Sequence, residues 1–300
     1  MTTEKPQKTF AEKLNTFDKR YIFVLLFILV SIPILRPIGF PLVISSDTLK
    51  AYSIISDIPA GSAVVFDYEC DTGGLAELQP IFIVVAKQLR AMDVRIIAVS
   101  WWGANNGGLF ADVSLHQVWT TQAEWDADYG TKFVNLGYIA GGETGIRAFA
   151  TNVKMVEYDQ YGNPTANMPV MQGLNTASDL AVVISFPWIV SAVTNPLNQF
   201  VAPGYTKVIE AVTSVMRTSV TPFLETGSLS AVIAGLTGAA EYEHLTGALG
   251  TGSLSMDAQT LAHILVISLI IVGNVGFAYT VLKRRAGIVS RETQGGKVNE

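Results

Sequence analysis

The chain has 300 residues and a single cysteine, which excludes an intrachain disulfide bond. Hydrophobic residues make up 49% of the chain and charged residues 15%, whereas about 25% charged residues is typical of soluble domains. Because the hydrophobic excess is concentrated near both ends, the sequence predicts two membrane segments with a domain between them.

The first apolar segment follows residues 1–20, which contain five Lys or Arg residues and are expected to form a cytoplasmic tail. We predict a transmembrane helix over 21–44, in which Tyr21–Leu35 carries no charge. Arg36 can extend to the lipid headgroups, and Pro33 kinks a membrane helix without forbidding it. A cleaved signal peptide is the alternative, although no small-x-small cleavage pattern follows this stretch.

The second membrane helix is predicted over 259–282. Its central run, Leu261–Leu282, has 22 residues and no charged side chain when His263 is neutral. A helix of this length covers roughly 33 Å, enough for a hydrocarbon core of about 30 Å. Residues 283–300 contain five more Lys or Arg residues and are expected to form a second cytoplasmic tail. The positive-inside rule then places the central domain outside the cytoplasm.

The central domain, residues 45–258, contains nine Lys or Arg and 20 Asp or Glu residues, a net charge of −11. We therefore expect no nucleic acid partner and no binding to anionic lipid surfaces. The domain alternates short apolar runs, typical of buried parallel strands, with helical stretches. The expected strands are Ala63–Phe66, Val94–Val99, Phe133–Leu136, Leu180–Ser185 and Lys207–Val215. The expected helices are Leu75–Met92, Leu109–Ala127, Glu143–Ala150 and Pro222–Leu245. This pattern predicts an open, mostly parallel, doubly wound (Rossmann-like) α/β sheet of about five strands.

The segments that follow three of these strands carry Gly-Gly pairs, and one also carries two tryptophans. In parallel sheets, ligands bind beyond the carboxyl ends of the strands, and glycine lets backbone N–H groups approach them. The candidate ligand-binding residues are Gly73, Gly74, Trp101, Trp102, Gly107, Gly108, Gly141 and Gly142. The glycines alternatively make tight turns, and none of the pairs fits a GxGxxG or P-loop pattern. The tryptophans can stack on a sugar or an aromatic ligand, contact a neighbouring subunit or pack beneath the loop.

Asp67, Glu69 and Asp71 alternate at the end of the first strand. An extended backbone directs all three to one side, where they would hold Mg²⁺ or Ca²⁺ through carboxylate oxygens. Acidic residues at this edge are also typical of phosphoryl-transfer enzymes, although Glu69 and Cys70 break the usual Asp-x-Asp-x-Thr spacing. The alternative is that Asp71 or Thr72 caps the following helix.

Small residues predict helix contacts. Five of them are expected on one face of the helix Pro222–Leu245: Ala231, Ala234, Gly235, Gly238 and Ala239. In the second membrane helix, Gly273 and Gly276 flank Asn274, whose amide costs free energy in a bilayer unless it finds a partner. Gly273, Asn274 and Gly276 are therefore predicted to form the contact of a homo-oligomer, or a contact with other membrane subunits.

Five segments carry a resemblance to a family: Phe66–Tyr68, Asn135–Tyr138, Thr226–Leu229, Gly238–Glu243 and Gly273-Asn274. With them, the chain resembles an uncharacterised family of two-span prokaryotic membrane proteins with an extracytoplasmic α/β domain. That family has no established activity, so the resemblance implies topology alone.

The leading functional hypothesis is a membrane-anchored extracytoplasmic assembly or binding subunit that acts as an oligomer in the lipid bilayer. The first alternative is a membrane-tethered hydrolase or transferase that uses Mg²⁺ or Ca²⁺ at the acidic strand end. The second alternative is an accessory subunit of a transporter, because two spans are too few to form a pathway.

Overall fold

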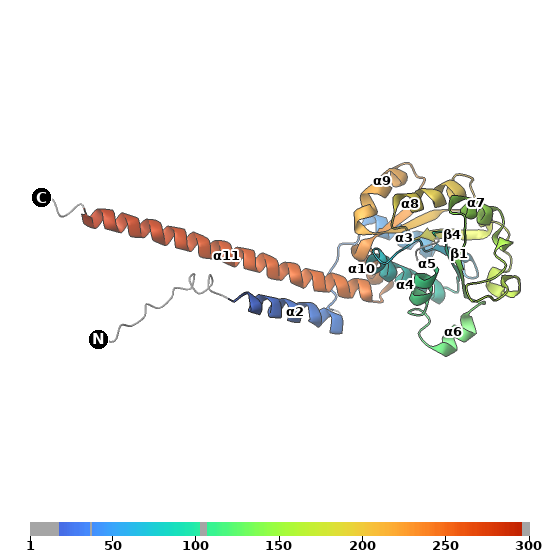
Figure 1. Ribbon diagram of the computed structural model, residues 1–300, viewed down its shortest axis with the longest axis horizontal. Coiled ribbons are helices and arrows are strands. Elements are labelled where there is room, and N and C mark those ends of the chain that lie inside the picture. The colour runs from blue at the N-terminus through green and yellow to red at the C-terminus, as the bar shows by residue number, and fades with distance from the viewer. Residues whose placement is uncertain (1–17, 37, 103–106, 296–300) are drawn as a thin grey trace. The chain divides into compact units, whose positions relative to one another are not determined.

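The computed structural model describes residues 18–36, 38–102 and 107–295 (Figure 1). Much of the two predicted tails, residues 1–17 and 296–300, lies outside the described residues. The chain divides into two units. One unit is Gly39–Met256, an α/β domain, and the other combines Met1–Ile38 with Asp257–Glu300.

The α/β domain is built on a six-stranded sheet with the order β3-β2-β1-β4-β5-β6. All neighbouring strands are parallel, which confirms the predicted parallel α/β architecture with one strand more than expected. The strands are β1 Ala63–Asp67, β2 Arg95–Ser100, β3 Phe133–Tyr138, β4 Leu180–Ser185, β5 Val208–Val212 and β6 Ala231–Ala234. Most of their residues are buried, as expected for a sheet covered on both faces.

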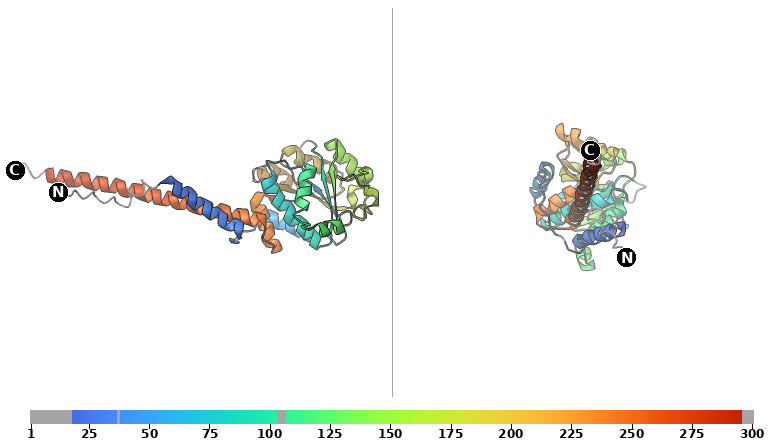
Figure 2. Two further views of the ribbon diagram at one scale, coloured as in Figure 1. Left: turned by 60° about the horizontal axis from the view of Figure 1, so that its bottom comes forward. Right: turned by 90° about the vertical axis from the view of Figure 1, so that its left-hand side faces the viewer.

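Helices cover both faces of the sheet because side chains alternate along each strand. Val64 and Phe66 pack with α3, α4, α5 and α10, whereas Ala63 and Val65 pack with α7, α8 and α9. Figure 1 and Figure 2 show helices on both sides of the strands. The helices of the domain are α3 Ser46–Ser56, α4 Leu75–Ala91, α5 Gly107–Leu115, α6 Gln122–Asp128, α7 Glu143–Thr151, α8 Val190–Pro196, α9 Arg217–Glu225 and α10 Gly235–Thr246.

The prediction of one helix over Pro222–Leu245 is wrong. The segment contains the end of α9, then β6, then most of α10. Gly227 has a φ of +76°, in the turn that follows α9. The next residues, Ala231–Ala234, pair in parallel with Ile209–Val212 of β5. The small residues of this segment therefore do not share one helix face.

The predicted helix Leu109–Ala127 is interrupted. It corresponds to α5 and α6, which are separate helices. A capping box starts α6: the Thr121 side chain accepts a hydrogen bond from the Glu124 backbone, and the Glu124 side chain accepts one from the Thr121 backbone. Such a box fixes a helix N-terminus, so α6 starts as a separate helix and does not continue α5.

Two glutamates of α10 hold the segments that lead into and out of the domain. Glu243 is buried, and its carboxylate accepts hydrogen bonds from the backbone N–H groups of Gly250, Gly252 and Ser253 over 2.7–2.9 Å. These groups surround the first turn of α11, Thr251–Gly295. Glu241 accepts a hydrogen bond of 2.6 Å from the hydroxyl of Ser45, the residue that caps α3.

The second unit contains α2, Lys19–Leu35, and most of α11. Among the described residues, one helical stretch is long and apolar enough to cross a membrane, Thr251–Leu282, and its most apolar window is only 11% buried. Exposed apolar side chains over such a length suit a lipid environment.

The structure does not form a single helix over 21–44, and no N-terminal span is evident in the described residues. At 17 residues, α2 covers roughly 26 Å, which is less than the hydrocarbon core. It ends because Arg36, which precedes a proline, is extended with a φ of −152°. Residues 38–45 are not helical, and Gly39 has a φ of +69°.

Candidate functional site

The carboxyl ends of β1 and β4 meet at the point where the strand order changes direction. Asp67 ends β1, Ser185 ends β4, and the two residues are neighbours in the sheet. Glu210 of β5 is the next neighbour of Ser185. Open α/β sheets bind ligands in the crevice at such a switch point. The fold therefore gathers buried polar side chains where a ligand is expected.

Asp67 and Glu69 form a hydrogen-bonded carboxyl pair, with 0% and 4% of their surfaces exposed. The hydroxyl of Ser185 donates to Asp67 Oδ2 over 2.9 Å. The backbone N–H groups of Trp101 and Trp102 donate to Glu69. Since a carboxylate has no proton to donate, a hydrogen bond between two carboxyl groups requires one of them to be protonated. The pair therefore shares one proton.

The surroundings favour Asp67 as the holder of that proton. Its Oδ1 faces no N–H or O–H donor in the described residues, and its pKa is raised well above the ordinary value, first by burial and then by the neighbouring carboxyl groups of Glu69 and Glu210. Burial also raises the pKa of Glu69, but the hydrogen bonds from Asp67 and from two backbone N–H groups lower it. Asp67 is therefore the acid and Glu69 the carboxylate. Burial raises the pKa of Glu210 well above its ordinary value.

Asp71 does not join this pair. Its Oδ1 accepts a hydrogen bond of 2.7 Å from the backbone N–H of Gly73, in the turn ahead of α4. No group of three or more His, Cys, Asp or Glu side chains in the described part of the chain is placed to hold a metal ion. The structure thus joins two of the three predicted metal ligands. It places the third in the turn before α4, but neither Asp71 nor Thr72 caps that helix, because its N-cap is Gly74, which makes no side-chain cap hydrogen bond.

A small chamber lies beside the carboxyl pair. Its walls are Asp67, Glu69, Trp101, Trp102, Gly142, Ile146, Ala192 and Asn195. Its free volume of about 10 Å³ corresponds to about one water position. The indole Nε1 of Trp101 is buried and has no hydrogen-bond partner among the described residues. The chamber therefore combines a carboxylate acceptor with an N–H donor that is available to a ligand.

An open cleft of about 630 Å³ shares Trp102 with the chamber. It is bounded by the carboxyl ends of β2 and β3, the start of α5 and residues 155–160. Trp102, Tyr138 and Tyr158 line the cleft and are 39%, 50% and 58% exposed. No Lys or Arg side chain lines it within the described ranges. Exposed aromatic side chains around a polar depression are typical of a site for a small ligand with a ring.

Asn135 holds the floor of this cleft. It is fully buried in β3, and its side chain donates to the carbonyl of Gly108 over 2.9 Å and accepts from the N–H of Gly137 over 3.0 Å. Its own carbonyl accepts from the N–H of Gln160 over 2.9 Å. One side chain thus connects the start of α5 and the end of β3, and its backbone adds the loop that closes the cleft.

The predicted glycines divide between two roles. Gly107 allows close packing, since a Cβ there would overlap Ser100 and the carbonyl of Tyr68. Gly108 lines the cleft, where a Cβ would lie 2.9 Å from Oε1 of Gln160. The other pairs end their loops directly before α4 and α7: Gly73, Gly74, Gly141 and Gly142. Gly142 lines the chamber with a φ of +52°, and a Cβ there would have no neighbour within 4 Å.

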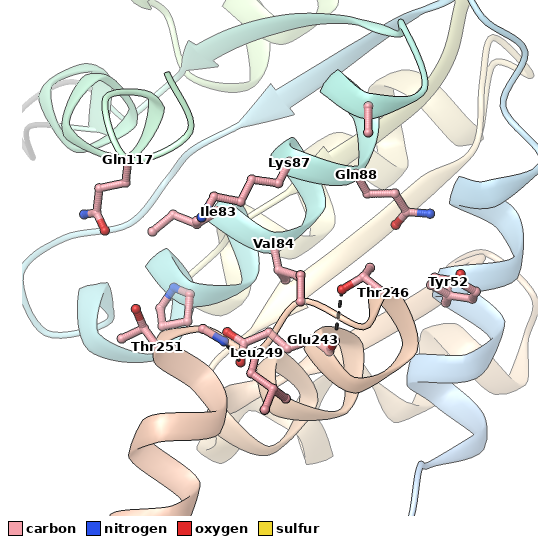
Figure 3. Close-up of a pocket in the computed structure, with 14 residues that line it drawn as sticks. Tyr52, Ile83, Val84, Lys87, Gln88, Gln117, Glu243, Thr246, Leu249 and Thr251 are labelled. Atoms are coloured by element: carbon pink, nitrogen blue, oxygen red, sulfur yellow. Dashed lines mark hydrogen bonds between the residues drawn. The ribbon is translucent and has the colours of Figure 1, made fainter. Parts of the chain in front are cut away.

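A further pocket of about 350 Å³ lies on the helical layer between α4 and residues 246–251 (Figure 3). Lys87 and Gln88 project from α4, and Glu243 and Thr246 come from α10. The Glu243 carboxylate is already occupied by three backbone N–H groups at the start of α11. This pocket therefore contains no free acid or base beside its single lysine, and the carboxyl edge remains the stronger candidate site.

The sequence interpretation missed Ser185, Glu210 and the loop 155–160. A glutamate inside the apolar strand Val208–Val212 was the available signal for Glu210, because a carboxylate is rarely buried in a strand without a specific role. The fold and this edge define a Rossmann-like α/β domain with a site at its switch point. Neither a protein-family model, nor a curated protein, nor a solved structure matches the chain.

The raised pKa values of the three buried carboxyl groups predict a pH-dependent stability. Asp67, Glu69 and Glu210 have raised pKa values in the folded state. Their contribution is therefore fully present below the ordinary pKa of about 4 and is lost as the pH rises through the folded values. Within that window, each proton held only by the folded state changes the free energy of unfolding by about 1.4 kcal/mol per pH unit. Asp67→Asn keeps a donor to Glu69 but does not titrate. We expect it to reduce the slope of the free energy of unfolding against pH by the contribution of about one proton.

The measurement is denaturant unfolding of the full chain in detergent at a series of pH values, with circular dichroism as the signal that monitors unfolding. Asp71→Asn is the matched control, since its amide oxygen can still accept from Gly73, and its slope should equal that of the wild type. Equal slopes in Asp67→Asn and the wild type would show that Asp67 holds no such proton.

Proposed function

We propose that this chain is a membrane-anchored extracytoplasmic binding subunit whose ligand site is the cleft at the carboxyl ends of β2 and β3. The observation that carries this proposal is the cleft itself, with three exposed aromatic side chains and a floor fixed by Asn135. Parallel sheets bind ligands at this edge, and the site needs no rearrangement of the strands.

The enzymatic alternative has less support. The Asp67–Glu69 pair faces a chamber with room for about one water molecule, and Asp71 is engaged in a turn. A hydrolase or transferase must place a reacting bond within hydrogen-bond reach of its acid and base. The chamber is too small for a reacting bond with its substituents, so the pair can reach at most one small group of a ligand held in the cleft, which adjoins the chamber at Trp102.

The anchoring part of the proposal is supported by the long apolar helix Thr251–Leu282. Exposed apolar side chains on α2, such as Phe23 and Phe27, support a second membrane contact in the segment that precedes the α/β domain. The Lys and Arg residues of both tails, with the acidic balance of the central domain, support an extracytoplasmic domain with cytoplasmic termini.

The binding proposal is tested by screening a library of small polar compounds against the full chain with ligand-observed NMR. We expect hits that compete for one site, because the cleft is a single depression. Trp102→Ala should weaken these hits at least about five-fold, since loss of a stacked aromatic surface costs about 1 kcal/mol or more. Val215→Ala, an 82% exposed side chain outside the cleft, is the control and should leave binding unchanged. Hits that survive Trp102→Ala would place the site elsewhere.

The topology is tested by labelling engineered cysteines in intact cells. The native Cys70 should stay silent because it is buried and burial raises the pKa of its thiol to about 12. An impermeant maleimide should react with Ser178→Cys, an exposed position in the domain, and should reach Ser290→Cys only after permeabilisation. The opposite pattern would reverse the proposed orientation.

We also propose that the subunit forms a homo-oligomer through the second membrane helix. Within the described residues, the hydroxyls of Ser268 and Thr280 donate to carbonyls of their own helix, whereas the exposed Asn274 amide has no partner. A second copy supplies an amide for each amide, and a Cβ at Gly273 would meet no atom of its own chain within 4 Å.

Asn274→Leu and Gly276→Leu should therefore lower the oligomer population in mild detergent, measured by light scattering. The first change removes a hydrogen bond that contributes on the order of 1 kcal/mol, and the second blocks close approach. Ile264→Leu conserves volume on the same helix, on the side away from Gly273, and should leave the population unchanged. An unaltered oligomer in both test variants would move the contact to another surface.

A further inference from the structure

We propose that the ligand of the cleft is a neutral carbohydrate, with its ring against the exposed aromatic side chains and one hydroxyl directed to Glu69 and Trp101. This inference rests on the proposed binding function and names the chemical class that the site accepts. Three independent features of the described residues lead to it: the aromatic rim, the hydrogen-bond pattern of the chamber and the charge of the lining.

The aromatic rim suits a sugar ring. Trp102, Tyr138 and Tyr158 all line the cleft and expose between 39% and 58% of their surfaces. Tryptophan and tyrosine combine an apolar face with a polar tip, so they can cover the C–H face of a sugar while hydrogen bonding to its edge. Three such side chains on one depression are too exposed to serve packing of the core alone.

The chamber has the hydrogen-bond pattern that a hydroxyl group satisfies. The buried Nε1 of Trp101 is a donor without a partner, and Glu69 is the carboxylate of the acid pair. Only a group that accepts one hydrogen bond and donates another satisfies both, and a hydroxyl does so. An ammonium group cannot accept from the indole N–H. A carboxylate or phosphate would stand against the charge of Glu69.

The size and position of the chamber agree with this pattern. Its free volume of about 10 Å³ admits one water-sized group and no more. Trp102 lines both the chamber and the cleft, so the two spaces adjoin at this side chain. A single hydroxyl of a cleft ligand can therefore take the position of one water molecule.

The charge of the lining disfavours anionic ligands. No Lys or Arg side chain of the described chain lines either the cleft or the chamber, and the central domain has a net charge of −11. Two neutral amides are present instead, Gln160 in the cleft and Asn195 in the chamber. Amides both donate and accept, which suits the hydroxyl groups of an uncharged sugar.

The test is saturation-transfer NMR and calorimetry on the full chain in detergent that carries no sugar headgroup. The probes are glucose, galactose, mannose, N-acetylglucosamine and their disaccharides, with adenine and methylammonium chloride as the aromatic and cationic comparisons. We expect at least one sugar to bind and both comparison probes to fail. Glu69→Gln should weaken the sugar by about ten-fold or more, because a hydrogen bond to a charged acceptor is replaced by a neutral one. Trp101→Phe should weaken it by a smaller factor, since it removes only the indole donor and some area.

The matched controls are Asp71→Asn and Val215→Ala, which should bind the sugar as the wild type does. Circular dichroism at the assay temperature confirms that each variant is folded. Binding of adenine or methylammonium in a Trp102-dependent manner, without any sugar, would overturn the carbohydrate inference and retain the binding function. Sugar binding that is insensitive to Glu69→Gln and Trp101→Phe would also overturn it. Failure of every probe and of the wider library would remove the binding function as well.

Discussion

The structure depends most on how three carboxyl groups are buried at one edge of the sheet with no Lys or Arg of the described chain paired to them. Burying an ionised carboxylate costs several kcal/mol unless it is hydrogen bonded or neutralised. Burial raises the pKa values of Asp67 and Glu210, which favours their neutral forms, and Glu69 accepts hydrogen bonds from two backbone N–H groups and from Asp67. Through Ser185, the same hydrogen bonds connect the ends of β1, β2 and β4. These hydrogen bonds tie the three strand ends together at the switch point.

The same contacts set the positions of the side chains that form the candidate site. The acid pair and Trp101 make a chamber for one small group, and Trp102 forms a shared wall with a cleft that has room for a ring. Asn135 fixes the other side of the cleft by connecting three backbone segments. Glu241 and Glu243 of α10 accept hydrogen bonds from the segments that lead into and out of the α/β domain.

The sequence predicted the parts of the fold that have a strong local pattern. The strands β1, β2 and β4 are largely apolar runs, and their parallel arrangement is confirmed. The four-residue strand Ala231–Ala234 was read as helix because alanine is a good helix former and only pairing with β5 makes it a strand. The site was predicted in part: Asp67, Glu69 and Trp102 come together, but Ser185 and Glu210 arrive from strands whose neighbours no local pattern reveals. The N-terminal membrane helix was predicted to be longer than α2, because hydrophobicity alone does not indicate that the helix ends at Arg36.

The central claim is that Asp67 is protonated in the folded protein at neutral pH. Infrared spectroscopy of the full chain in a detergent without ester groups measures this directly, because protonated and ionised carboxyl groups absorb at different frequencies. The account predicts two protonated carboxyl bands, from Asp67 and Glu210, of which Asp67→Asn removes one and Glu210→Gln the other. A protonated carboxyl spectrum that Asp67→Asn leaves unchanged would contradict the account.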